Sequence, residues 1–381
     1  MRILACINLA MLCIISACTD RQDAEGIMTV DLNRDYPEKQ YILQDFMNVE
    51  YVPLESSDAF ITRAAVRAVG EKYFVLENSG KLLLFDRHTG KGIRVIDHKG
   101  QGAEEYTNAY KVENDEVKDE LFVNDSGTYK ICVYDLEGNF KRAFNHPEGH
   151  QFIDVTIFDD ETMICYDEQV YLDYATPPTE KHSYHYLISR QDGSIVREIK
   201  VPYEKLNVPM LMVGDMVSMT FVNTMVPLHD DMLIIENSAD SIYRFTRKEH
   251  RLEPFMAKIA STDPERLMTI GTVTPHYCFY EVVDKTFDQS TNRSFPNYSF
   301  VYDRQTHEIF KSEVLNADFT VPEPVNMVRL AINGKIACIQ TLQPHKLMEA
   351  YEKGELKGEL RDIASQLNED SNPVLMVMTE K

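Results

Sequence analysis

Short runs of consecutive apolar residues recur along the chain, and each run ends at a polar or turn-forming residue. The five clearest runs end at Asp86, Asp135, Arg190, Thr246 and Asp303. Successive ends lie 49 to 57 residues apart. Apolar residues at consecutive positions predict short strands that are covered on both faces. A regular spacing of this length indicates one structural unit that is used several times.

Tight turns follow most of these runs. Two examples are Asp86-Arg-His-Thr-Gly90 and Asp135-Leu-Glu-Gly138. Aspartate accepts hydrogen bonds from backbone groups two residues ahead, and glycine adopts the positive φ that closes such turns. A further apolar run follows each turn, and another precedes most of them. The unit is therefore an antiparallel meander, and its length is close to the roughly 40–50 residues of a propeller blade.

The two ends of the chain supply the last unit. Val328–Ile332, Ile336–Gln340 and Val374–Thr379 read as three strands, and Val49–Leu54 reads as the fourth. Placing both ends of the chain in one sheet removes an exposed sheet edge and closes a ring. The sequence therefore predicts an all-β fold over residues 31–381. We expect a six-bladed β-propeller of four-stranded antiparallel blades.

Two further features test this prediction. Two β-sandwich domains are the competing architecture, but the repeat continues across the middle of the chain, where no Pro-, Gly- or Ser-rich linker occurs. Apolar residues at three- and four-residue steps predict one amphipathic helix at about 345–368, before the closing strand. Gly354 and Gly358 weaken this helix.

The N-terminus has the features of an export signal. The segment from Ile3 to Ile15 is almost entirely apolar, but it is shorter than the roughly 20 residues that span a bilayer. The residues Ile15, Ser16, Ala17 and Cys18 follow and resemble a bacterial lipobox, with Cys18 as the lipidated residue. We predict a lipoprotein signal peptide at 1–17 and a flexible tether at 18–30; an ordinary cleaved signal is the alternative.

Composition excludes one class of partner. Asp and Glu number 61 against 39 Lys and Arg, a formal charge of −22, and an acidic surface repels nucleic-acid phosphates. Four cysteines follow the tether region, and each lies within an apolar run without metal-ligand spacing. We expect these four to be buried free thiols; they are Cys132, Cys165, Cys278 and Cys338.

Six motifs in order carry a resemblance that spans nearly the whole chain. They are Val49-Glu-Tyr-Val-Pro-Leu-Glu55, Lys99-Gly-Gln-Gly-Ala-Glu-Glu-Tyr106, Tyr134-Asp-Leu-Glu-Gly-Asn-Phe140, Asp240-Ser-Ile-Tyr243, Leu252-Glu-Pro254 and Asn372-Pro-Val-Leu375. On these motifs the chain resembles the six-bladed, NHL-like β-propeller lipoproteins of Bacteroidetes, a family without an established activity. The resemblance implies that residues 99–106 link two blades and bind no nucleotide. Here Ala103 and Glu104 depart from the usual Pro and Gly.

Three loop segments are rich in residues that could contact a ligand. The methionine-rich segment 206–221 is one, and the other two contain the candidate ligand-binding residues Tyr171, Tyr174, His182, Tyr184, His276, Tyr277 and Arg293. The alternative is that these are long blade loops that pack on each other. His182 and His185 would face opposite sides of a strand, so we predict no metal site. We also expect no cofactor, and no catalytic residue is assigned.

Two functions remain open on this sequence. The first is a non-catalytic lipoprotein of the cell envelope, anchored to the outer membrane through Cys18 and facing the periplasm or the cell surface. Its propeller would bind a glycan, a peptide or an envelope protein through loops on one face. The second is a hydrolase or lyase with a metal or acidic site at the channel mouth, which rests on fold-level analogy alone.

Overall fold

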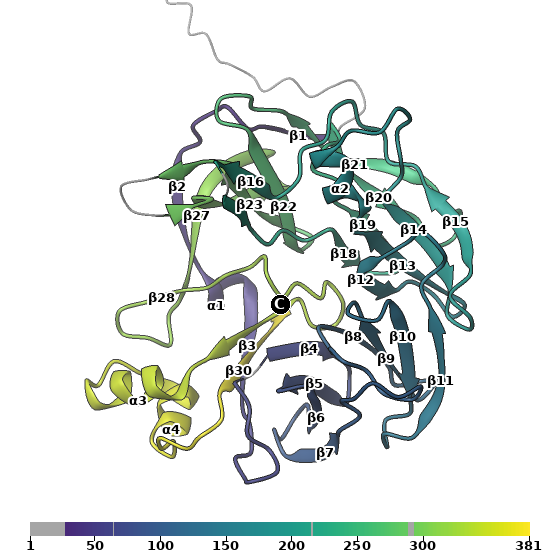
Figure 1. Cartoon of the computed structure of the whole chain (residues 1–381). Coiled ribbons are helices and arrows are strands. Elements are labelled where there is room, and N and C mark those ends of the chain that lie inside the picture. Colours follow the sequence, from purple (N-terminus) through teal and green to yellow (C-terminus); the bar gives the residue numbers. More distant parts are fainter. Residues whose placement is uncertain (1–26, 64, 215, 289–292) are drawn as a thin grey trace, which may run out of the picture.

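Six antiparallel sheets are arranged as blades around a central axis (Figure 1). This architecture is seen in a computed structural model of the chain, which describes residues 27–63, 65–214, 216–288 and 293–381. The all-β, six-bladed propeller predicted from the sequence is confirmed. The predicted signal peptide and Cys18 lie outside the described residues. Within the part of the chain that the structure describes, no helix is long and apolar enough to cross a membrane.

Blades 1 to 3 each contain four consecutive strands. Blade 1 consists of β4 (Ala65–Val69), β5 (Tyr73–Asn78), β6 (Lys81–Asp86) and β7 (Gly92–Ile96). Blade 2 consists of β8 (Lys111–Asp115), β9 (Glu120–Asp125), β10 (Lys130–Tyr134) and β11 (Phe140–Asn145). Blade 3 consists of β12 (Phe152–Ile157), β13 (Thr162–Asp167), β14 (His185–Ser189) and β15 (Ile195–Ile199).

Blades 4 and 5 each gain a fifth strand from the N-terminal segment. Blade 4 consists of β18 (Met225–Leu228), β19 (Asp231–Ile234), β20 (Ser241–Phe245), β21 (Leu252–Ile259) and β1 (Met28–Asp31). Blade 5 consists of β22 (Arg266–Val273), β23 (Tyr277–Asp284), β26 (Asn297–Asp303), β27 (Glu308–Asn316) and β2 (Glu38–Ile42). Both added strands run parallel to their neighbours.

The N-terminal strap, residues 28–42, was not predicted. Its first strand begins at Met28, inside the range 18–30 that we assigned to a tether. The strap covers the outer edges of blades 4 and 5, which would otherwise present unpaired backbone groups to solvent. A single helical turn, α1 (Leu43–Phe46), then leads into blade 6.

Blade 6 joins the two ends of the chain, as predicted. It contains β29 (Cys338–Leu342), β30 (Val374–Glu380) and β3 (Met47–Pro53), and Val49 lies opposite Met378. The predicted strand Val328–Ile332 is wrong. This segment forms one isolated bridge, between Ala331 and Cys338. The Asn326 side chain accepts hydrogen bonds from the N–H groups of Val328 and Arg329, so these groups close a turn instead of a ladder.

The predicted helix at 345–368 is divided into two. The helices are α3 (Pro344–Glu352) and α4 (Gly358–Ala364). Gly354 has a φ of +70°, which lies in the left-handed region and ends α3. Leu347, Leu356 and Leu360 are buried in the core that blade 6 shares with blade 5. The amphipathic character expected for this segment is therefore retained.

Burial on both faces explains the consecutive apolar residues. In β6, Leu82 and Leu84 pack toward blade 2, whereas Leu83 and Phe85 pack toward blade 6. Each such side chain contributes about 1.5–3 kcal/mol when it leaves water. The four cysteines named above lie in these layers as free, buried thiols, as predicted.

The glycine-containing segment 99–106 is a turn, as the resemblance implied. The Gly100 N–H donates to the Tyr106 carbonyl, and the Gly102 N–H donates to the Glu105 carboxylate at 2.8 Å. A β-carbon on Gly100 would lie 1.9 Å from a Glu105 oxygen. The carboxylate therefore fills the space that a phosphate would need.

All the long connections lie at one end of the ring. In an antiparallel meander, the link between the second and third strands and the link to the next blade share one end. The long-loop face is formed by segments 168–184, 200–224, 285–296, 317–327 and 343–373. It carries α2 (Gln169–Ala175), the hairpin β16 (Met210–Val213) to β17 (Met216–Met219), the hairpin β24 (Phe287–Asp288) to β25 (Arg293–Ser294), and β28 (Glu323–Pro324).

Candidate binding site

The seven residues proposed as ligand contacts do not form one site. Tyr171, Tyr174, His182 and Tyr184 lie in or beside segment 168–184 of blade 3, on the long-loop face. Arg293 lies on the same face, exposed in β25 of blade 5. His276 and Tyr277 lie where β22 turns into β23, at the opposite end of the ring.

The blade 3 residues form a cluster around one buried carboxylate. Asp173 accepts hydrogen bonds from His182 Nδ1 at 2.7 Å and from the Tyr184 hydroxyl at 2.8 Å. Its other oxygen accepts one from Gln169 at 2.7 Å. Burial raises the pKa of Tyr184. These hydrogen bonds join residues of the loop to one another, so the cluster orders the loop.

Tyr174 helps to bury a lysine from blade 5. The Lys285 ammonium lies 4.9 Å from the centroid of the Tyr174 ring. It also lies 3.0 Å from the Asn207 side-chain oxygen and 3.3 Å from a Glu265 carboxylate oxygen. Segments 168–184, 200–224 and 285–296 of the long-loop face therefore contact one another around the Lys285 ammonium group. The contacts around Lys285 fit the alternative given above, in which the long blade loops pack on each other.

His276 and Tyr277 support the fold. His276 Nδ1 lies 2.6 Å from the Gln305 side-chain nitrogen. The Tyr277 ring contacts Tyr41 and Phe46 edge to face, with centroids 5.5 and 5.4 Å apart. Tyr277 thereby anchors the end of the N-terminal strap against blade 5.

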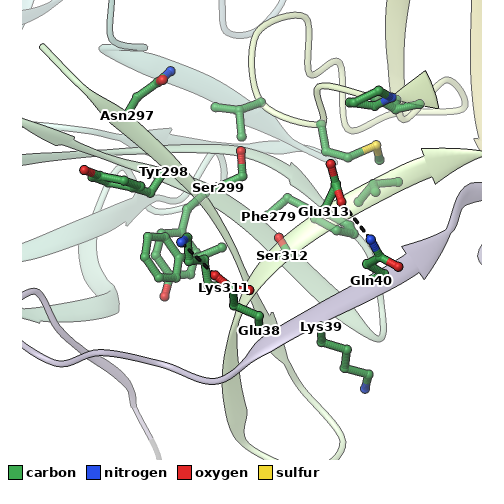
Figure 2. A pocket seen from close by; sticks show the side chains of 17 residues that line it. Glu38, Lys39, Gln40, Phe279, Asn297, Tyr298, Ser299, Lys311, Ser312 and Glu313 are labelled. Atoms are coloured by element: carbon green, nitrogen blue, oxygen red, sulfur yellow. Dashed lines mark hydrogen bonds and ion pairs between the residues drawn. The ribbon is translucent and has the colours of Figure 1, made fainter. Parts of the chain in front are cut away.

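An opening in blade 5 is a feature that the sequence did not reveal. β26 pairs with β23 along its whole length, from Asp303 to Asn297. Its pairing with β27 stops at Phe300 and Lys311. Beyond that pair the two strands diverge, and the gap between them is the blade 5 slot. Figure 2 shows Asn297, Tyr298 and Ser299 on one side of this slot and Glu313 with Gln40 on the other.

The slot has an apolar floor and a polar rim. Its volume is about 420 Å³, within the roughly 300–1,000 Å³ of ligand pockets. The floor is formed by the buried or partly buried residues Phe279, Val314, Val325, Met327 and Val328. On the rim, Lys311 pairs with Glu38 at 2.9 Å, and Gln40 donates to Glu313 at 2.9 Å. Both contacts hold the N-terminal strap to β27 (Figure 2).

The methionine-rich segment singled out in the sequence forms the hairpin β16–β17 beside the slot. Leu211 packs on Leu267 and Val283 of blade 5, and β16 lies next to β22 and β23 in Figure 1. Val208 and Met210 of this segment are buried, but five of its large apolar side chains have 54 to 62% of their surface exposed; they are Met212, Met216, Val217, Met219 and Phe221.

The exposed hairpin and the slot form one continuous surface. A small second cavity lies between them and is lined by Phe221 and Asn223 together with Asn297 and Val328 of the slot. The Asn223 side chain donates to the Val328 carbonyl at 3.1 Å, and the Ser218 and Ser294 hydroxyls lie 2.7 Å apart. We call this combined region the blade 5 surface.

A separate cavity, away from the blade 5 surface, lies between blades 2 and 3 and has a volume of about 440 Å³. His150 lines it, and its Nδ1 lies 2.6 Å from a carboxylate oxygen of Asp167. Across residues 27–63, 65–214, 216–288 and 293–381, no group of three or more His, Cys, Asp or Glu side chains could hold a metal ion.

One of two similar solved structures shares this fold. The "Putative exported protein" of Bacteroides fragilis NCTC 9343 superposes with a TM-score of 0.64 at 12% identity, covering 93% of this chain and 99% of that chain. A member of the DUF4221 family from Bacteroides vulgatus ATCC 8482 gives a TM-score of 0.43 at 10% identity, covering 89% and 99%. At 12% identity the first of these likenesses concerns the fold alone. No curated protein matches the chain.

The sequence itself assigns the family. The profile of one family, described as a domain of unknown function, matches residues 28–379. That match starts at the first strand of the N-terminal strap and ends within the closing strand β30. It agrees with the resemblance noted above to Bacteroidetes propellers without an established activity. This chain belongs to the DUF4934 family.

Proposed function

We propose that this protein is an exported, lipid-anchored protein of the cell envelope that binds a polypeptide partner through the blade 5 surface, without catalysis. The observation that carries the proposal is the set of five exposed apolar side chains next to an open slot, four of them on β16–β17 and the fifth, Phe221, just after β17. Monomeric proteins rarely expose apolar residues in such groups unless they bind something. Methionine side chains adapt to apolar surfaces of different shapes.

A protein partner is favoured over a glycan at this surface. Sugar hydroxyls are bound by polar side chains whose hydrogen-bonding groups are available. On the rim of the slot, Lys311 and Glu38 pair with each other, and so do Gln40 and Glu313. The hairpin offers Met212, Met216 and other side chains that neither donate nor accept strong hydrogen bonds.

The anchor is supported by the N-terminal sequence. Ile15, Ser16, Ala17 and Cys18 fit a lipobox, and several acyl chains on one cysteine anchor a protein durably without a membrane helix. The likeness in fold to the "Putative exported protein" of Bacteroides fragilis supports export. Labelling growing cells with a fatty-acid analogue should mark the wild-type chain and leave Cys18→Ala unmarked. An unmarked wild-type chain would contradict the anchor.

Site-specific photocrosslinking in intact cells tests the binding surface. A photoreactive residue at Met216 or Phe221 should crosslink to the same envelope protein. Val117 is the matched control, because it is an exposed apolar residue, 96% accessible, in a loop at the opposite end of the ring. The same crosslink from position 117, or crosslinks to envelope polysaccharide alone, would refute the proposal.

A further inference from the structure

The edge of β26 that faces the blade 5 slot has no strand beside it. Asn297, Tyr298 and Ser299 are all exposed and pair with β23 on one side only. The chain covers the outer strands of blades 4 and 5 with β1 and β2, whereas the outer strands β7, β11 and β15 of blades 1 to 3 have no further described strand beside them. β28 covers the end of β27 at Leu315 and Asn316. Among the described residues, the slot edge of β26 is left open.

Backbone direction at this edge follows from one hydrogen bond. The Lys311 N–H donates to the Pro37 carbonyl on the strap, so it points away from β26. Lys311 lies opposite Phe300. Backbone groups alternate sides along a strand, so Phe300 directs its own groups to β23. Asn297 and Ser299 therefore direct their N–H and C=O groups toward the slot.

The length of the slot suits a short extended segment. It is bounded at one end by the Phe300–Lys311 pair and at the other by β28, where the Val325 N–H donates to the Val314 carbonyl at 2.8 Å. From Lys311 to Val314 the strand advances by three residues, a distance of about 10 Å at 3.3 Å per residue. An extended chain places alternate side chains on opposite faces, so one of them would enter the apolar floor between Phe279 and Met327.

We propose that the partner of the blade 5 surface binds by adding a strand to β26. An extended segment of the partner pairs with Asn297 and Ser299 through its backbone and inserts an apolar side chain into the slot. This mode of recognition takes affinity from main-chain hydrogen bonds and specificity from pockets for alternate side chains. The inference rests on the proposed function and names how the polypeptide is held.

The test uses the full-length chain in detergent and a phage-displayed library of short linear peptides. Peptides selected on the wild-type chain are measured against Ser299→Pro and Ser299→Ala. Proline removes the N–H that points into the slot, and proline is tolerated at strand edges whose N–H is unused in the fold. We expect Ser299→Pro to keep the melting temperature and to lose binding by about tenfold or more, whereas Ser299→Ala binds like the wild type.

A scan of the selected peptide does not depend on the folding of any variant. Each peptide nitrogen is methylated in turn. Strand addition predicts losses of about tenfold that alternate with a period of two residues, because only every second N–H faces β26. Losses of affinity without this period, or equal binding of the peptide to Ser299→Pro and to the wild type, would overturn strand addition. The proposed function would then still be tested separately by the crosslinking experiment. Self-association of the chain that Ser299→Pro abolishes would also overturn it, because a second copy would then occupy the slot.

Discussion

The hydroxyl of Tyr51 donates a hydrogen bond to Asp318 at 2.8 Å and accepts one from Asn316 at 2.8 Å. Tyr51 lies in β3, the N-terminal strand of blade 6, whereas Asn316 and Asp318 lie at and after the end of β27 in blade 5. The same two side chains also accept hydrogen bonds from Gln44. Tyr51 therefore ties β3, the outer strand of blade 6, to the end of β27 in blade 5.

Tyr51→Phe should destabilise the protein by about 1–3 kcal/mol. The substitution keeps the ring and removes the hydroxyl, so the buried polar groups that it bonds lose a partner. Tyr351→Phe is the control, because Tyr351 is an exposed residue of α3 and its loss of a hydroxyl should change little. Denaturant unfolding of both variants measures the difference. Equal midpoints for the two variants would contradict the role of this contact.

Gly271→Ala should be among the more damaging small substitutions. A β-carbon at Gly271 would lie 2.2 Å from the Val328 α-carbon and 2.6 Å from the Met327 carbonyl oxygen. Both are backbone atoms, so the backbones of blade 5 and of segment 327–328 must move apart, at a cost of about 1–3 kcal/mol. Gly334→Ala is the matched control, because nothing lies within 4 Å of the added carbon. Thermal unfolding compares the two, and a melting temperature for Gly271→Ala near that of Gly334→Ala would refute the close approach.

The buried His146 should lower the free energy of unfolding as the pH falls from about 6.5 to about 4. Its Nδ1 accepts the Phe152 N–H, and its Nε2 lies 2.8 Å from the Asn124 side-chain oxygen, so the folded protein holds a neutral ring. Burial lowers the pKa of His146 from 6.5 to about 4. The unfolded chain therefore binds the proton first as the pH falls. Stability is fully present above about pH 6.5, and roughly 3 kcal/mol is lost on the way to pH 4.

Unfolding measured across this pH range checks the effect. His146→Gln should flatten the dependence, although His185, whose pKa burial also lowers to about 4, will retain its own share. His345→Gln serves as the control, because His345 is exposed on α3. A slope that is unchanged in His146→Gln would show that other groups set the pH dependence.

Asp173→Asn should loosen segment 168–184 without unfolding the ring. The amide replaces one acceptor oxygen by a donor, so at least one of the three donors around it loses its partner. Hydrogen exchange in this segment should become faster while the global unfolding midpoint changes little. Asp230→Asn is the control, because its side chain is 92% exposed. Unchanged exchange in Asp173→Asn would contradict the ordering role of this carboxylate.

The architecture of this protein could be predicted from its sequence because the signals are local. Leu82 to Phe85 are apolar at consecutive positions because each strand is buried on both faces. Asp86 accepts the N–H groups of His88 and Thr89, which is the turn chemistry that the sequence predicted. The joining of Val49–Leu54 with the last strand followed from the need to remove a sheet edge.

The binding surface was decided by the tertiary structure. The slot exists because the pairing of β26 with β27 stops at Phe300 and Lys311, and no residue type at these positions signals where a ladder ends. The parallel addition of β1 and β2 joins residues more than 220 positions apart. The sequence drew attention to Tyr184, His182 and the methionine-rich segment by composition alone. The tertiary structure shows that Tyr184 is buried and bonded to Asp173, whereas Met216 is exposed. The sequence could not distinguish them, because burial depends on neighbours that are remote along the chain.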